Sequence, residues 1–163
     1  MLTPTPGASR GRGATGLPPM TDLGAEYRYM IDECGASIGA AVSELCAPGA
    51  LPALVHCAAG QDRTGIVIAL VLAVLGVPDE LIGADYSLSS VYLDPDSTAM
   101  TGRLKAADPG DNVTAELLSS QAGLILNVLA WARAAGGGSV SGYLTAHGVG
   151  APDLAALRSA LVR

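Results

Sequence analysis

Several residue types that mark other classes of protein are scarce in this chain of 163 residues. It has no phenylalanine and one tryptophan, and its 3 cysteines are an odd number. A small, odd cysteine count argues against a disulfide framework and favours reduced thiols. Lysine and arginine total 9 against 15 acidic residues, which gives a net charge of -6. Because the basic residues form no run, the composition argues against nucleic acid or an anionic membrane as a partner.

Long apolar runs are also missing. The longest, residues 66–77, ends before Pro78 and is too short to cross a bilayer, which takes about 20 apolar residues. Residues 1–20 are rich in Pro, Gly, Thr and Ala and contain no apolar stretch, so they are predicted to be a disordered tail rather than a signal peptide. These features favour a soluble, cytoplasmic protein with one domain over residues 21–163 and no stable membrane insertion.

The apolar pattern predicts a mainly helical chain with a single strand. Apolar residues at gaps of three and four predict one amphipathic helix from about Asp22 to Leu45. The segment LPALVHC, residues 51–57, is bounded by turn residues and is predicted to be a buried strand. A lone strand cannot pair its backbone groups, so a sheet would need further strands. Helices are predicted at 63–76, 78–90, 114–135, 139–148 and 152–163, with an irregular loop at 94–112.

The stretch HCAAGQDRTG, residues 56–65, gathers polar groups between the predicted strand and the most apolar helix. A loop between a strand and a helix N-terminus suits an anion, because its amides point at the ligand. A cysteine there, Cys57, would have a lowered pKa, and the guanidinium of Arg63 could grip two phosphate oxygens. Thr64 could donate its hydroxyl to the thiolate, and Gly60 lets the backbone turn. The local pattern predicts a phosphate-binding loop around a cysteine nucleophile.

The spacing of His56-Cys57, five residues, and Arg63-Thr64 resembles the HCX5R(S/T) signature of cysteine-dependent protein tyrosine phosphatases. The whole stretch is similar to the HCxxGKDRTG loop of the bacterial tyrosine/lipid phosphatase branch, with Gln61 in place of the lysine. The segments GVPDELIGADYSLSS and GGSVSGYLTAHGVGAPDLAALRSALV resemble the same branch. The resemblance therefore covers about residues 22–163.

This resemblance implies a phosphomonoester hydrolase that needs no cofactor or metal and acts on phosphotyrosine protein or another phosphomonoester. Cys57 would attack phosphorus to give a cysteinyl-phosphate, which water then hydrolyses. Asp62 matches a loop aspartate that is a candidate general acid, with ordinary helix capping as the alternative. His56 and Thr64 would support the loop. The residues implied to hold the phosphate are Ala58, Ala59, Gly60, Gln61, Asp62 and Arg63.

For the fold, the resemblance implies an α/β architecture, with the catalytic strand-loop-helix unit joined to a mainly helical remainder. The first sheet strands are expected before residue 22, where residues 1–20 do not supply them. A truncated chain, a homo-oligomer that supplies the strands and a helical remnant are the alternatives. In function, the alternative is a catalytically inactive fragment that binds phosphate or a partner protein. Asp94 and Asp96 are further candidates that a loop could carry to the site, with a solvated turn as the alternative.

Overall fold

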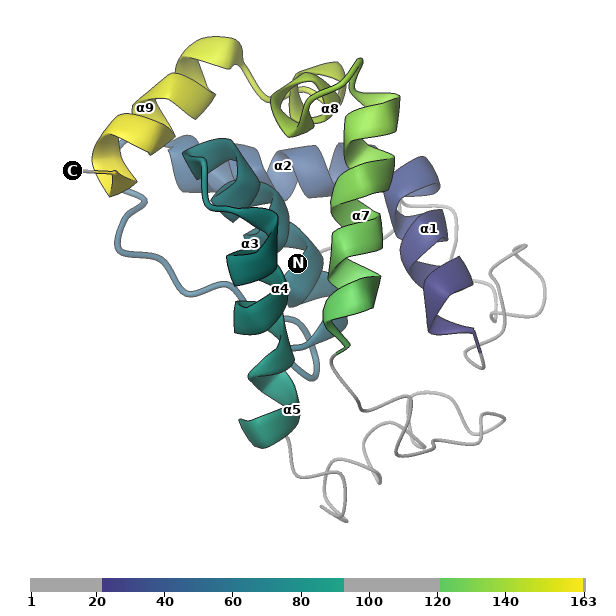
Figure 1. Ribbon diagram of the computed structural model, residues 1–163. Helices are drawn as coiled ribbons and strands as arrows, with labels where there is room; N and C mark the ends of the chain where they lie inside the picture. Colours follow the sequence, from purple (N-terminus) through teal and green to yellow (C-terminus); the bar gives the residue numbers. More distant parts are fainter. Residues whose placement is uncertain (1–21, 93–120, 163) are drawn as a thin grey trace.

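The computed structural model describes residues 22–92 and 121–162, and helix α3 lies at the centre of these residues (Figure 1). No strand occurs in the part of the chain that the structure describes. No helix within these two ranges is long and apolar enough to cross a membrane. The helices are α1 (Leu23–Glu33), α2 (Gly35–Cys46), α3 (Asp62–Leu75), α4 (Asp79–Ser87), α5 (Ser89–Tyr92), α7 (Ala122–Ala135), α8 (Val140–Ala146) and α9 (Ala151–Leu161).

Helix α3 is central because it is apolar on almost every face. It contacts α2, α4, α7, α8 and α9. It ends at Gly76, whose φ of 88° is left-handed and so suits glycine. The predicted buried helix at 63–76 is confirmed with a start one residue earlier. Its buried residues are Ile66, Val67, Ala69, Leu70, Val71 and Val74.

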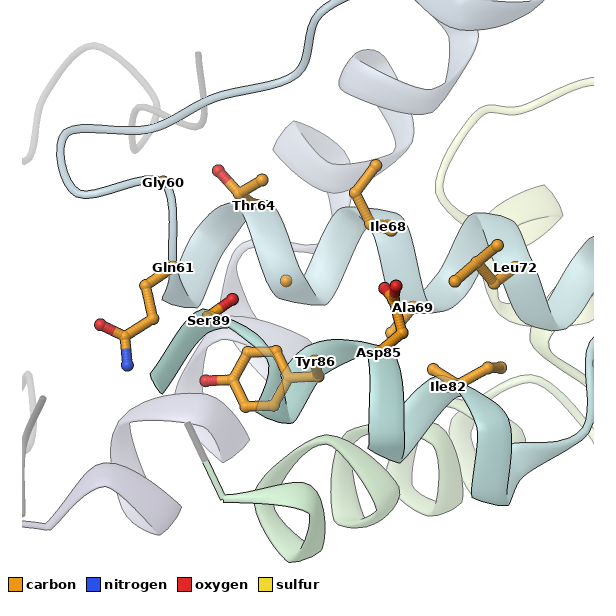
Figure 2. A pocket seen from close by; sticks show the side chains of 11 residues that line it. Gly60, Gln61, Thr64, Ile68, Ala69, Leu72, Ile82, Asp85, Tyr86 and Ser89 are labelled. Atoms are coloured by element: carbon orange, nitrogen blue, oxygen red, sulfur yellow. The ribbon is translucent and has the colours of Figure 1, made fainter. Parts of the chain in front are cut away.

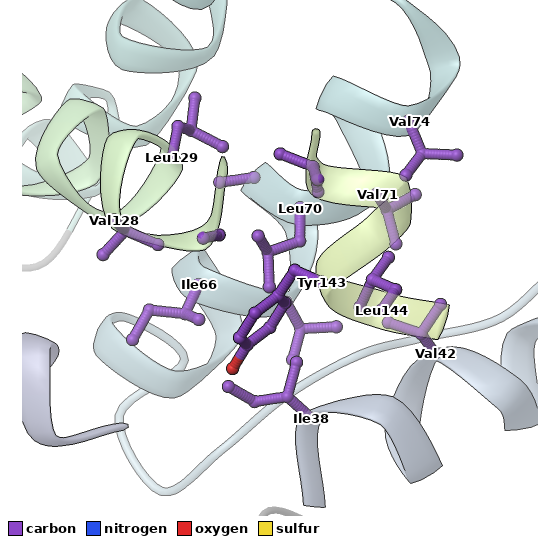
Figure 3. Close-up of a cluster of buried hydrophobic side chains, with 14 of the residues drawn as sticks. Ile38, Val42, Ile66, Leu70, Val71, Val74, Val128, Leu129, Tyr143 and Leu144 are labelled. Atoms are coloured by element: carbon purple, nitrogen blue, oxygen red, sulfur yellow. The ribbon is translucent and has the colours of Figure 1, made fainter. Parts of the chain in front are cut away.

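A tyrosine from α8 completes the core around α3. Tyr143 is fully buried and belongs to the same apolar cluster as Ile38 of α2 and Leu70 of α3 (Figure 3). Its hydroxyl donates to the backbone carbonyl of Ile31 in α1 at 2.8 Å, which gives this buried polar group the partner it requires. Helix α8 therefore ties both N-terminal helices to α3.

The prediction of one helix over residues 22–45 is wrong, because the segment forms two helices. Asp22 caps the first, as predicted for its start, but α1 ends at Glu33 and α2 begins at Gly35. The two helices meet at Cys34, whose φ of -103° and ψ of 14° leave the helical range. Helix α2 then packs closely on the end of α8: a Cβ added at Gly35 would lie 2.2 Å from Nε2 of His147, and one at Gly39 would lie 2.0 Å from its carbonyl oxygen. Hydrophobic spacing alone does not reveal this close packing of α2 against α8.

The predicted buried strand at 51–57 is also wrong for the described residues. The segment is irregular, and Leu54 is 88% exposed. Because no strand occurs between residues 22–92 or 121–162 to pair with it, no ladder forms. What the structure shows is a mainly helical arrangement. The predicted loop at 94–112 and the first residues of the helix predicted at 114–135 lie outside the described residues.

Candidate active site

The loop before α3 turns at Gly60. This residue has φ of +74°, in the left-handed region that favours glycine. A Cβ added there would meet no atom within 4 Å. The backbone conformation, and not a lack of space, is therefore what requires glycine at this position. The turn leads through Gln61, the N-cap residue, into the first turn of α3 at Asp62.

The thiol of Cys57 lies half-buried inside this turn. Burial alone raises its pKa, but hydrogen bonds from the Thr64 hydroxyl and from the amides of Thr64, Gly60 and Gln61 outweigh it, so the net pKa of Cys57 is lowered. The Thr64 hydroxyl oxygen is buried and has no other hydrogen-bond partner in the described part of the chain, which leaves the neighbouring thiol of Cys57 as the group to which it can donate. The loop and the first turn of α3 thus stabilise a thiolate, the form of cysteine that acts as a nucleophile.

The other two cysteines differ from Cys57. All three are free thiols. Burial, and then the charge of Glu33, raise the pKa of Cys34, while burial and the charge of Asp153 raise that of Cys46. Only Cys57 among the three has a lowered pKa. The chain therefore offers one activated thiol, and it is the one in the loop.

The carboxyl group of Asp62 is held by α1. The Tyr27 hydroxyl donates to Oδ1 of Asp62, and it also lies 2.5 Å from the Tyr86 hydroxyl of α4. Burial raises the pKa of Asp62, while the hydrogen bond from Tyr27 and the charge of Arg63 act against that rise. Asp62, the residue predicted as a general acid, thus lies at the start of α3 with its carboxyl group bonded to a neighbouring helix.

The sequence alone does not predict Tyr27 or Tyr86 as part of the site. Tyr27 falls within the apolar pattern that predicts a helix from Asp22 to Leu45, and Tyr86 falls within the segment GVPDELIGADYSLSS. Both side chains are buried, at 0% and 5% exposure. A buried tyrosine hydroxyl usually has a hydrogen-bond partner. That rule is the one sequence-level signal that could have directed attention to Tyr27.

The remaining predicted residues surround Cys57 in different ways. His56 is exposed, and its Nδ1 lies 3.2 Å from the carbonyl oxygen of Cys57, so it contacts the loop backbone. Ala58 is exposed and Ala59 half-buried, as is Arg63 in the first turn of α3. Gln61 is only 2% exposed. It contributes to the site through its backbone amide, which donates to the thiol of Cys57. Asp94 and Asp96 lie outside the described residues.

A small cavity of about 100 Å³ lies beside the loop, between α3 and α4 (Figure 2). Gln61 and Thr64 line its loop end, Ile68 lines the α3 side and Tyr86 the α4 side. Neither Cys57 nor Arg63 lines it, so the cavity adjoins the thiol without including it. Across residues 22–92 and 121–162, no group of three or more His, Cys, Asp or Glu residues could hold a metal ion.

Comparison with known proteins identifies the class. A sequence profile of the tyrosine phosphatase family matches residues 7–163, and the chain belongs to this family. The predicted resemblance is thereby confirmed. A tyrosine-protein phosphatase of Nostoc commune is 34% identical over 114 residues, or 64% of this chain and 37% of that protein. The triple specificity protein phosphatase PtpB of Mycobacterium tuberculosis is 46% identical over 72 residues, or 44% of this chain and 25% of that protein. The matches thus span well under half the length of these relatives.

Proposed function

We propose that this protein hydrolyses phosphomonoesters, with phosphotyrosine in proteins as the main substrate, through a cysteinyl-phosphate on Cys57. The observation that carries the proposal is the thiol itself. Its pKa is lowered by three backbone amides, two in the loop and one in the first turn of α3, and by the Thr64 hydroxyl, and Arg63 follows it at the spacing of the family signature. The relatives named as protein phosphatases support phosphorylated proteins as the substrate class.

The proposed reaction has two steps. In the first, the Cys57 thiolate attacks phosphorus, so a sulfur–phosphorus bond forms while the bond to the leaving oxygen breaks. The amides of Ala58 to Arg63 and the Arg63 guanidinium bind the three equatorial oxygens, where charge accumulates. In the second, water attacks phosphorus, inorganic phosphate leaves and the thiolate is restored.

Asp62 is the proposed general acid for the first step. The leaving oxygen needs a proton as its bond to phosphorus breaks, and a carboxyl group is a suitable donor if it holds that proton near neutral pH. The burial that raises the pKa of Asp62 favours its protonated form. His56 and Thr64 act on the loop and on the thiolate, and they do not supply the proton to the leaving oxygen.

We also propose that the protein forms an α/β sheet in a homo-oligomer, in which another copy supplies the partner strands. The irregular segment at 51–57 leads directly into the loop, and its Leu54 is 88% exposed. A partner strand along this segment would cover that side chain and pair the backbone that precedes Cys57. On this proposal, Leu54 is exposed in a single copy and buried in the oligomer.

The test is hydrolysis of an aryl phosphate by the full chain, its variants being checked for folding by circular dichroism. We expect vanadate-sensitive turnover that is absent in Cys57→Ser and falls by about 10²-fold or more in Arg63→Ala. The matched control is Cys46→Ser, which removes a thiol whose pKa is raised and should leave turnover unchanged. Turnover in Cys57→Ser equal to that of the unmodified chain would reject the proposal. A folded protein that binds phosphate without turnover would favour the inactive, phosphate-binding alternative.

The substrate class is tested with the same protein. Phosphotyrosine peptides, phosphoserine peptides and phosphoinositide in micelles are compared by kcat/KM. We expect the highest value for phosphotyrosine peptides. A higher value for phosphoinositide would keep the enzyme assignment and reject protein phosphotyrosine as the main substrate.

A further inference from the structure

We propose that Tyr27 is a positioning residue that holds the carboxyl group of Asp62 for proton transfer, an inference that rests on the proposed function. Tyr27 lies in α1, 35 residues before Asp62 in the chain, and its hydroxyl donates to Oδ1 of that carboxyl group. Its side chain is fully buried. A hydrogen bond that joins a buried hydroxyl to a loop carboxyl fixes the direction of both side chains.

The Tyr86 hydroxyl is the second hydrogen-bond partner of the Tyr27 hydroxyl. The hydroxyls of Tyr27 and Tyr86 lie 2.5 Å apart, and either could donate to the other from distance alone. A hydroxyl has only one proton to donate. Because Tyr27 gives its proton to Asp62, Tyr86 must be the donor to Tyr27. The three groups form a directed chain from Tyr86 of α4 through Tyr27 of α1 to Asp62 of α3.

This chain determines which oxygen of Asp62 carries the proton. Oδ1 accepts from Tyr27, so the proton of the neutral carboxyl group is placed on Oδ2. The charged and titratable groups that act on this carboxyl are Tyr27 from α1 and Arg63 from its own helix, with Tyr86 of α4 acting through Tyr27. Tyr27 thus does not touch the substrate, and it orients the residue that does.

The sign of the effect follows from the same contacts. The hydrogen bond from Tyr27 favours the carboxylate, so it lowers the pKa of Asp62 against the rise caused by burial. Tyr27→Phe keeps the ring, and therefore most of the burial, and removes that bond. The pKa of Asp62 should rise, and the acid form should persist to higher pH.

The first experiment is the pH dependence of kcat for Tyr27→Phe in the full chain, with aryl phosphates of good and poor leaving groups. We expect the alkaline limb to move upward by about one pH unit, and kcat to fall several-fold more for the poor leaving group. Tyr29→Phe is the matched control, because Tyr29 lies in the same helix and makes no hydrogen bond to the loop within the described part of the chain. An unchanged profile in folded Tyr27→Phe would overturn the inference.

A second measurement does not depend on turnover. Carbon-13 NMR titration of the Asp62 carboxyl, assigned by its loss in Asp62→Asn, is carried out in Cys57→Ser protein with and without Tyr27→Phe. We expect a higher titration midpoint when Tyr27→Phe is present. An equal midpoint would overturn the inference. A raised midpoint together with no turnover in the unmodified chain would reject the proposed function while the coupling between Tyr27 and Asp62 stands.

Discussion

The ring of Tyr86 in α4 lies against the backbone of Gly65 in α3: a Cβ added at Gly65 would come within 2.5 Å of Cε2 of the ring. Gly65 stands three residues after Asp62, in the helix that the loop leads into. The missing side chain lets Tyr86 approach closely enough to reach the Tyr27 hydroxyl at 2.5 Å. The last glycine of HCAAGQDRTG therefore sets the position of the tyrosine pair behind the loop.

Gly65→Ala is expected to displace the Tyr86 ring. Overpacking of this kind costs roughly 1–3 kcal/mol of the free energy of unfolding, and it exceeds the gain in helix propensity of about 1 kcal/mol. Urea denaturation measures the change. The control is Gly123→Ala in α7, where an added Cβ would meet nothing within 4 Å and stability should not fall. Equal stability of Gly65→Ala and the unmodified chain would contradict the packing described.

Thr64→Val is expected to raise the pKa of Cys57. The Thr64 hydroxyl is the first of the groups that lower this pKa, and valine keeps the shape of the side chain while it removes the donor. The rate of iodoacetamide alkylation against pH reports the thiolate fraction. We expect the midpoint to move upward and the rate at pH 7 to fall several-fold. The measurement uses the Cys34→Ser, Cys46→Ser background, and a midpoint that stays in place would show that the hydroxyl does not act on the thiolate.

The ion pair of Asp79 and Arg133 is expected to add little to the free energy of unfolding, and to add it only at a pH where Asp79 is ionised. Arg133 donates to both carboxyl oxygens of Asp79 at 2.7 Å, and the side chains are 37% and 40% exposed. Solvent screening limits such a pair to about 0.2–1 kcal/mol. Because these hydrogen bonds lower the pKa of Asp79, the contribution is complete above the unfolded pKa of roughly 3.9 and is lost as pH falls through the folded value.

A double-mutant cycle with Arg133→Met and Asp79→Asn measures this coupling at pH 7 and near pH 2. We expect the coupling energy to vanish at the lower pH and to shrink with added salt. A coupling that persists in strong acid would mean that the pair is not the source of the lowered pKa.

Gly39→Ala is expected to destabilise the protein more than Gly65→Ala. Its Cβ would lie 2.0 Å from the carbonyl oxygen of His147, a backbone atom that cannot move away as a side chain can. We expect a loss above about 2 kcal/mol, measured by urea denaturation. A loss no larger than that of Gly65→Ala would argue against the close packing of α2 on α8.

The features that the sequence predicts correctly are those that depend on residues close together in the chain. The loop HCAAGQDRTG and the buried helix after it follow from local spacing. The bond from Tyr27 to Asp62 and the packing of Gly35 and Gly39 on His147 do not, because each joins segments distant in the chain. The strand predicted at 51–57 failed for a related reason: a strand is defined by a partner, and the described residues contain none.

The measurement that tests the central claim most directly is detection of the phosphorylated enzyme. The full chain is mixed with an aryl phosphate, quenched in acid within the first turnover, digested and analysed by mass spectrometry. The account predicts one added phosphoryl group on the peptide that contains Cys57, and none in Arg63→Ala or after prior alkylation of Cys57. A phosphoryl group on a different residue, or turnover without any on Cys57, would contradict it.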